Sequence, residues 1–220
     1  MLRYLPGCTT RTHHPEAISR ITAYMESRGA AVATCCKDPG KLLEPGDAIV
    51  ANCTMCDLIL RERYPESRVL SLYEWVLGDS SFPWPDHRGE AVTVQDCWRA
   101  RGNRSMQEAV RACLRRMNFT VVEQEARFEQ ADFCGVWLWN EIPDATALAA
   151  PRTFGEIRRN HVRLLPPVEQ KRRMEEWVKR YRTDRVLCYC NGCEAGLRLG
   201  GIAPTHLVEL VAENLPAAVS

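Results

Sequence analysis

Cysteines are the residues of this chain whose type and spacing could do chemistry, and they occur at short intervals in both halves. The first half holds a lone Cys8, the adjacent pair Cys35 and Cys36, and a CxxC step formed by Cys53 and Cys56. A thiolate is both a metal ligand and a nucleophile, so five thiols that converge on one place predict a metal or redox site. A CxxC pair that enters a helix brings two thiolates to one centre, and the helix amides there favour negative charge.

The second half repeats this order of a lone cysteine, a cysteine-containing turn and a CxxC step. Its candidate ligands are Cys97, Cys134, Cys190 and Cys193. Phe133 stands where the first member of an adjacent cysteine pair would be. Cys188 lies two residues before Cys190, on the same face of an expected strand, and is a further candidate ligand. The shared order indicates an internal duplication.

Eleven cysteines in a chain without a signal peptide favour metal ligation over disulfide bonds. Zinc needs only four thiolates, so the fifth cysteine of the first half favours an iron–sulfur cluster there. The four cysteines of the second half would serve a conventional cluster or zinc, or that half keeps a structural role alone. Cys113 differs, because it lies on the apolar stripe of an expected helix and is predicted to belong to the core.

Composition narrows the classes of function. The 220 residues carry a net charge of +1, which gives no reason to expect nucleic acid as a partner. No apolar run is long enough to span a membrane, so we expect a cytoplasmic protein. A glycine-rich nucleotide motif and a ferredoxin-type cysteine run are both missing from the sequence. His13 and His14 follow Cys8 in a turn and could line a pocket there.

Short apolar segments alternate with helical patterns, and the cysteines follow the apolar segments. Strands are predicted at residues 2–5, 30–34, 47–52, 68–72, 91–95, 119–123 and 185–189. Helices are predicted at residues 15–28, 56–64, 105–117 and 205–214. This alternation predicts an α/β fold with two pseudo-repeated βαβ domains and mostly parallel sheets. Ligands of such sheets bind at the carboxyl ends of the strands, where these cysteines fall.

The domain boundary is expected at a segment rich in Pro, Gly and Ser. We predict a first domain at residues 1–77, a linker at 78–90 and a second domain at 91–220. The second domain carries a helix-rich insertion at residues 153–181.

These motifs resemble a known family. The pattern YLPGC, CC and CTMC, followed by VQDC, FCG and CNGC, is similar to the cysteine-rich CCG domains. Such domains occur in tandem in the B subunit of heterodisulfide reductase, and related copies occur in the iron–sulfur subunits of glycolate, lactate and glycerol-3-phosphate dehydrogenases. The resemblance implies a non-cubane 4Fe–4S cluster on Cys8, Cys35, Cys36, Cys53 and Cys56, and a second site on Cys97, Cys134, Cys190 and Cys193. Lys37 and Phe133 depart from the pattern, and Phe133 removes one ligand from the second site.

The resemblance implies an iron–sulfur oxidoreductase subunit that takes electrons from a flavoprotein or ferredoxin-like partner. Its substrate would be a disulfide or another small molecule, and no catalytic residue is assigned. One alternative is a non-catalytic scaffold or redox sensor that holds zinc or a single cluster. Another is an electron-relay subunit of a flavin-linked dehydrogenase.

Overall fold

The structure is a computed structural model, and it describes residues 1–33, 35–37 and 43–217. The first half forms a parallel sheet with the strand order β2-β1-β3-β4. Its strands are β1 (Leu2–Leu5), β2 (Ala31–Val32), β3 (Ala48–Ala51) and β4 (Arg68–Ser71). Central β1 pairs with β2 on one side and with β3 on the other, so its carboxyl end lies between theirs.

The second half forms another parallel sheet, with the strand order β6-β5-β7-β8. Its strands are β5 (Ala91–Gln95), β6 (Thr120–Val122), β7 (Arg185–Cys188) and β8 (Thr205–His206). In both sheets the first strand of the half lies between the second and the third, and the fourth pairs with the third. The repeated order confirms the predicted α/β class with two parallel sheets.

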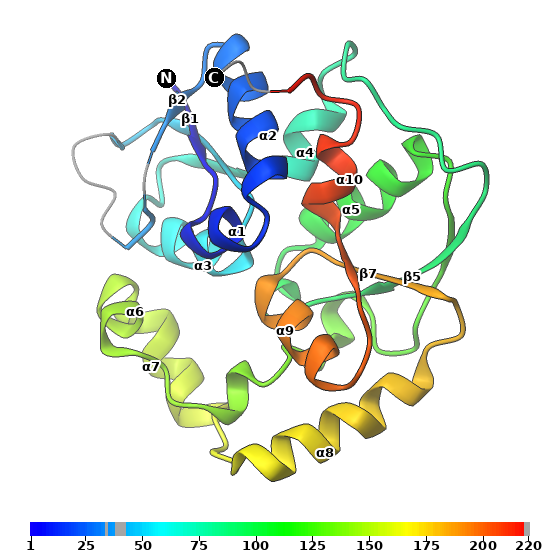
Figure 1. The fold of residues 1–220 in the computed structure, drawn as a ribbon. Helices are drawn as coiled ribbons and strands as arrows, with labels where there is room; N and C mark the ends of the chain where they lie inside the picture. The colour runs from blue at the N-terminus through cyan, green and yellow to red at the C-terminus, as the bar shows by residue number, and fades with distance from the viewer. Residues whose placement is uncertain (34, 38–42, 218–220) are drawn as a thin grey trace.

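Four helices accompany the first sheet (Figure 1). They are α1 (Cys8–His13), α2 (Pro15–Ser27), α3 (Thr54–Arg63) and α4 (Leu72–Leu77). Helix α2 begins with Pro15 at a position that needs no N–H donor, and Gly29 follows its end at φ +79°. Helix α4 begins with a capping box, in which the side chain of Ser71 accepts from Glu74 N and that of Glu74 accepts from Ser71 N.

The second half has three helices in corresponding places, α5 (Arg104–Arg116), α9 (Asn191–Leu199) and α10 (Leu207–Ala212). Between β6 and β7 lie α6 (Asp144–Ala149), α7 (Pro151–Asn160) and α8 (Pro167–Trp177). The described residues also form four 3₁₀ turns, η1 (Trp98–Ala100), η2 (Phe128–Gln130), η3 (Trp137–Trp139) and η4 (Val178–Arg180). The helix-rich insertion is therefore present and begins before residue 153, with α6.

The two halves share a single hydrophobic core. Helix α4 of the first half packs on α5 of the second, and α10 of the second half packs on α2 of the first. The two contacts are reciprocal, because α4 and α10 each follow the fourth strand of their sheet. Figure 1 shows α10 between α2 and α5.

Several element boundaries differ from the sequence-based expectation. The last helix begins at Leu207, because Thr205 and His206 pair with β7 as an edge strand. Helix α3 begins at Thr54, since Cys53 is already its N-cap. The segment predicted as a strand at residues 30–34 pairs only over Ala31–Val32, and residue 34 lies outside the described residues. Helices α1 and α4 are too short, at six residues each, for periodicity to predict them.

Candidate metal centre

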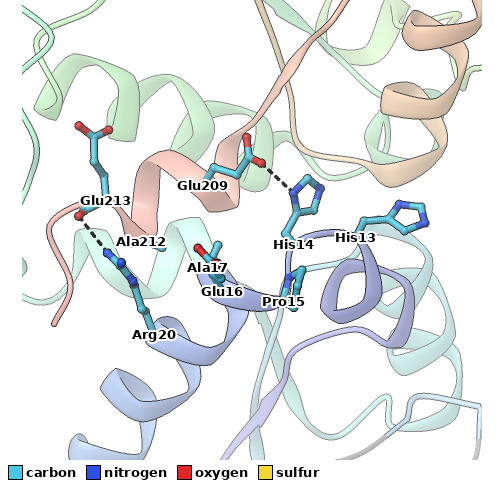
Figure 2. A pocket seen from close by; sticks show the side chains of 9 residues that line it. All are labelled: His13, His14, Pro15, Glu16, Ala17, Arg20, Glu209, Ala212 and Glu213. Atoms are coloured by element: carbon cyan, nitrogen blue, oxygen red, sulfur yellow. Dashed lines mark hydrogen bonds and ion pairs between the residues drawn. The ribbon is translucent and has the colours of Figure 1, made fainter. Parts of the chain in front are cut away.

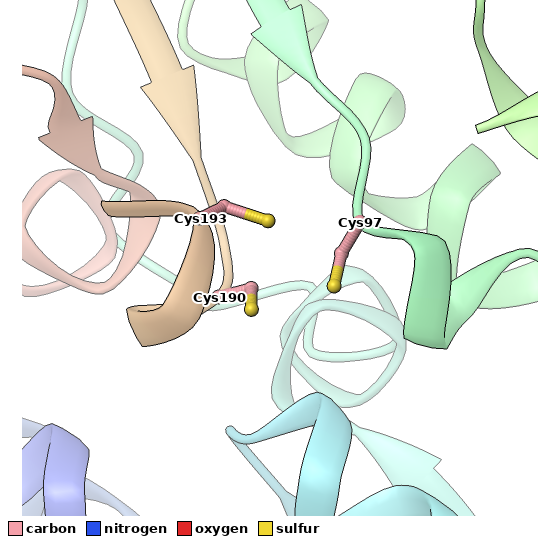
Figure 3. A group of neighbouring side chains, drawn as sticks. All are labelled: Cys97, Cys190 and Cys193. Carbon is pink, nitrogen blue, oxygen red and sulfur yellow. The ribbon is translucent and has the colours of Figure 1, made fainter. Parts of the chain in front are cut away.

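Four cysteines of the second half meet at the carboxyl end of the second sheet. Cys97 follows β5, Cys190 is the N-cap of α9, and Cys193 lies in the first turn of that helix. The sulfur atoms of these three lie within 4.8 Å of one another (Figure 3). The Cys134 sulfur lies 3.7 Å from that of Cys97, and all four side chains are buried. This buried group has the donors for a metal.

Glycines bring the two cysteine-bearing turns of this group into contact. Gly135 has φ +57°, and a Cβ there would lie 1.9 Å from the Gly192 carbonyl oxygen. A Cβ on Gly196 would lie 2.3 Å from the Gly135 Cα. The absence of side chains at Gly135 and Gly196 therefore lets the turn that carries Cys134 lie directly on α9.

A bound metal sets the distances between its thiolate ligands. Four thiolates at about 2.3 Å from one tetrahedral zinc ion lie about 3.8 Å apart. The Cys97–Cys134 separation of 3.7 Å matches this value. A four-iron cluster also accepts four thiolates, but its irons and sulfides lie between the ligands and hold them farther apart. The donor set fits a zinc ion and a cluster alike. The Cys97–Cys134 pair is spaced for a single ion, but the thiols that all lie within 4.8 Å of one another are Cys97, Cys190 and Cys193, without Cys134.

Three cysteines of the first half form a similar group beside the first sheet. The Cys56 thiol hydrogen-bonds to Cys36 and to Cys53, and these bonds lower the pKa of Cys36 and bring that of Cys53 to about 7. The same bonds raise the pKa of Cys56 well above its ordinary value. Cys36 and Cys56 are buried, and Cys53 is half-buried. Cys53 and Cys56 are presented by the start of α3 as the second-half CxxC pair is presented by α9.

The remaining two first-half candidates lie beside this group. Cys8 begins α1 and is exposed, and a Cβ on Gly7 would lie 3.2 Å from the Cys53 Cβ. Cys35 is half-buried. Within the described part of the chain, no thiol–thiol hydrogen bond joins Cys8 or Cys35 to the group.

The two thiol groups face each other across the boundary between the halves. The Thr54 hydroxyl, at the start of α3, lies 3.9 Å from the Cys97 sulfur. Asn191, at the corresponding place in α9, donates to the Thr10 hydroxyl at 2.8 Å. Each helix that carries a CxxC pair thus reaches the turn after the lone cysteine of the other half.

Arg99 lies between the two groups and is buried, with 8% of its surface exposed. Its guanidinium donates to the Cys190 sulfur at 2.9 Å. The Cys190 pKa lies well below its ordinary value, because neighbouring thiols hydrogen-bond to it and Arg99 adds positive charge. The same guanidinium lowers the pKa of Cys53 through its charge, so it acts on thiols of both halves. This arrangement stabilises thiolates, the form in which cysteine binds metals or attacks sulfur.

An acidic residue follows each CxxC pair and clamps the halves together. Asp57 accepts from Asn103 of the second half at 3.2 Å and from Arg61 at 2.9 Å. Glu194 accepts from His14 of the first half at 2.9 Å and from Arg198 at 2.8 Å. The two clamps have the same plan, an acid held by an arginine four residues later and by a polar residue of the other half.

The His14 clamp is also spaced like a metal site, since His14, Glu194 and His206 offer ligand atoms within 4.8 Å. The second imidazole nitrogen of His14, however, lies 3.0 Å from a Glu209 oxygen. Bonds to Glu194 and Glu209 raise the His14 pKa to about 9, and burial lowers that of His206 to about 4. A charged His14 between two carboxylates is a complete ion-pair network. His13 and His14 both line a cavity of about 440 Å³, as expected of a pocket after Cys8 (Figure 2).

Three residues singled out in the sequence lie outside both thiol groups. Phe133 is buried against Trp177, with ring centroids 4.8 Å apart, so its side chain packs toward the insertion. Cys188 is fully buried, and burial raises its pKa well above the ordinary value. The Cys113 thiol donates to the Tyr73 carbonyl oxygen at 3.6 Å, in the core between the halves.

Sequence reasoning missed Arg99 and the two acidic clamps. Arg99 comes two residues after Cys97, and Asp57 and Glu194 each come directly after a CxxC pair. The recurring acid after CxxC, with arginine four residues later in both halves, was a signal that could have been found. The role of Arg99 had no such signal, because its counterpart after Cys8 is Thr10.

Comparisons with family models, with curated proteins and with solved structures gave no match. Among the described residues, no helix combines the length and the apolar character needed to cross a bilayer.

Proposed function

We propose that this chain is an iron–sulfur oxidoreductase subunit that takes electrons from a partner protein and reduces a disulfide or another small substrate. The observation that carries the proposal is the meeting of two thiol groups, one from each half, across a single buried guanidinium. A structural metal site needs only one group of thiol ligands, so a second thiol group facing the first favours a redox function. The resemblance to tandem CCG domains supports the same function.

The first-half group, with Cys8 and Cys35 beside it, would hold a 4Fe–4S cluster. The second-half group would hold a second cluster or a zinc ion. A bound cluster supplies electrons one at a time. Reduction of a disulfide takes two electrons from the partner and two protons from water, breaks the S–S bond and releases two thiols. Arg99 would stabilise the negative charge that develops on sulfur.

The donor of these electrons would be a flavoprotein or a ferredoxin-like subunit. We place the protein in the cytoplasm, where cysteines stay reduced and available as ligands.

A second candidate function is a zinc-binding scaffold or redox sensor. It is favoured by the 3.7 Å separation of the Cys97 and Cys134 sulfurs, which suits one tetrahedral ion. A third candidate, a relay subunit of a flavin-linked dehydrogenase, shares the clusters but binds no substrate at them.

Metal content and EPR of anaerobically purified protein test the proposal. We expect iron and sulfide in the wild-type protein, a loss of iron in Cys36→Ser, and a loss of iron or zinc in Cys134→Ser. The control is Cys113→Ala, which removes a buried thiol outside both groups and should keep the wild-type metal content.

Stoichiometric zinc without iron would overturn the redox proposal and support the scaffold. If iron is present, addition of a small disulfide to the reduced protein separates the remaining two functions. A changed EPR signal supports catalysis at the cluster, and an unchanged signal supports relay.

A further inference from the structure

A cavity of about 300 Å³ lies between α3, the start of α5 and α7, next to the thiol groups. Its lining includes Trp98, Arg99, Arg101, Arg61 and His161. Arg99 belongs both to this lining and to the thiol centre, because it donates to the Cys190 sulfur at 2.9 Å. The Arg99 side chain therefore connects the cavity to the thiols.

The charges around this cavity leave a positive excess. Asp57 is already bonded to Arg61 and to Asn103, and Glu156 lies 3.4 Å from the His161 ring. Arg101 stacks over Trp98, with its guanidinium carbon 4.4 Å from the ring centroid, and forms no ion pair within the described ranges. The lining acids thus have partners, whereas the Arg101 guanidinium is available to an anion.

Arg99 adds an unsatisfied donor. Its Nε is buried and has no hydrogen-bond partner, although its Nη2 donates to the Cys190 sulfur. A buried donor without a partner costs about 1–3 kcal/mol, so such a group indicates a ligand that would complete it.

Comparison of the halves shows that the fold does not require these arginines. Counted from the lone cysteine, Arg99 corresponds to Thr10 and Arg101 to Thr12. Thr10 is fully buried and serves the same boundary with a hydroxyl group. The charges of Arg99 and Arg101 are therefore an addition made by the second half at these two positions.

We propose that this cavity binds the carboxylate of a small sulfur compound and holds its sulfur beside the thiol groups. Arg101 and Arg99 would hold the carboxylate, as guanidinium groups favour carboxylates through paired, charge-assisted bonds. Trp98 and Ile157 would contact the apolar carbons of the molecule. The identity of the sulfur compound as the substrate rests on the proposed function, whereas the anion binding does not.

Calorimetric titration of the anaerobically purified full chain tests this proposal. The probes are 3-(methylthio)propionate and the neutral 3-(methylthio)-1-propanol, two thioethers that exchange with no thiol. We expect the carboxylate to bind at least about tenfold more tightly than the alcohol. The variant is Arg101→Gln, because Arg101 is exposed and its loss leaves the core intact. It should weaken carboxylate binding about tenfold, whereas the exposed Arg115→Gln on α5 should leave it unchanged.

Equal binding of both thioethers, no binding of either, or full affinity in Arg101→Gln would each overturn the proposal. The assay uses no electron donor, so its result is independent of the redox function. Carboxylate binding in a protein that reduces no disulfide would sustain this inference and contradict the proposed function. If the protein reduces a disulfide but binds both thioethers equally, the proposed function is sustained and this inference is contradicted.

Discussion

Asn103 and His14 each lie six residues after the lone cysteine of their half, and each reaches the acid after the CxxC pair of the other half. The position is the same, but only His14 can titrate near neutral pH. Its side chain is 3% exposed and lies between Glu194 and Glu209. One of the two clamps is therefore sensitive to pH, and the other is not.

The pKa of His14 gives the direction of this effect. A pKa raised from 6.5 to about 9 means that the folded protein holds the proton more tightly than the unfolded chain. The ion pairs of His14 contribute fully to the stability of the folded protein below about pH 6.5. This contribution is lost as the pH rises through about 9. We expect His14 to contribute a loss on the order of 2 kcal/mol over this window, against the opposite contribution of Cys53, whose lowered pKa of about 7 adds stability as the pH rises. His14→Asn should lack the His14 contribution, measured as its difference from the wild type in urea unfolding at pH 6, 7.5 and 9.

His13→Asn is the matched control, because His13 is exposed and lies beside the same cavity. It should keep the wild-type dependence on pH. An equal loss of stability in His14→Asn over the same window would show that the clamp does not titrate as described. The carboxylates of Glu194 and Glu209 do not titrate in this pH range, because their pKa values are lowered. Their contribution to the free energy of unfolding is lost only at acidic pH.

Among the elements, α9 has the most demanding role. It presents Cys190 and Cys193, carries the clamp acid Glu194, and accepts the turn of Cys134 against its surface. This last contact requires glycine at 135 and 196, since a larger residue would meet backbone atoms that cannot move aside. The fourth thiol of the second-half group reaches the other three only through this contact.

Gly196→Ala should therefore separate the Cys134 turn from α9. The added Cβ would lie 2.3 Å from the Gly135 Cα, and we expect a loss of about 1–3 kcal/mol in unfolding free energy. Metal at the second-half group should fall with it, as measured by metal analysis and thermal unfolding. Gly155→Ala on α7 is the control, because its Cβ would lie 3.5 Å from an arginine side-chain atom, an ordinary contact. That change should be neutral or stabilising, since alanine is the better helix former. Wild-type stability in Gly196→Ala would contradict the close packing described.

In the whole molecule, each half packs one helix against a helix of the other half. Helix α4 packs on α5 and α10 packs on α2, so each half covers apolar surface of the other. Tyr73 of α4 meets Tyr189 across this boundary, with ring centroids 6.2 Å apart. The thiol centre lies on the same boundary and depends on both halves.

The shared core predicts that the halves do not fold separately. We expect the full chain to unfold in one cooperative calorimetric transition. Fragments 1–90 and 91–220, expressed alone, should expose the surfaces of α2, α4, α5 and α10 and give no cooperative transition. Two separate transitions in the full chain, or a stably folded fragment, would show that the halves are independent domains.

Most strands, several helices and the buried position of Cys113 could be predicted from the sequence alone. Alternating apolar and helical segments predicted the parallel sheets, because strand and helix periods are local properties of the chain. The recurring order of cysteines predicted one thiol group in each half. Cys97, Cys134, Cys190 and Cys193 lie together in the second half, whereas in the first half hydrogen bonds join only Cys36, Cys53 and Cys56 of the five predicted ligands. The stripe of α5 likewise predicted that Cys113 would be buried in the core.

The contacts between the two halves could not be predicted from the sequence and are known only from the tertiary structure. The roles of Arg99, His14 and Glu194 depend on contacts between residues up to 195 positions apart, and no local pattern encodes such a contact. The facing of the two thiol groups depends in the same way on reciprocal packing of helices from different halves. Phe133 stands in place of a cysteine in the sequence, but its packing against Trp177 depends on where the insertion lies in the fold. Periodicity gives each element its buried face, whereas the pairing of those faces is set by the packing of the whole core.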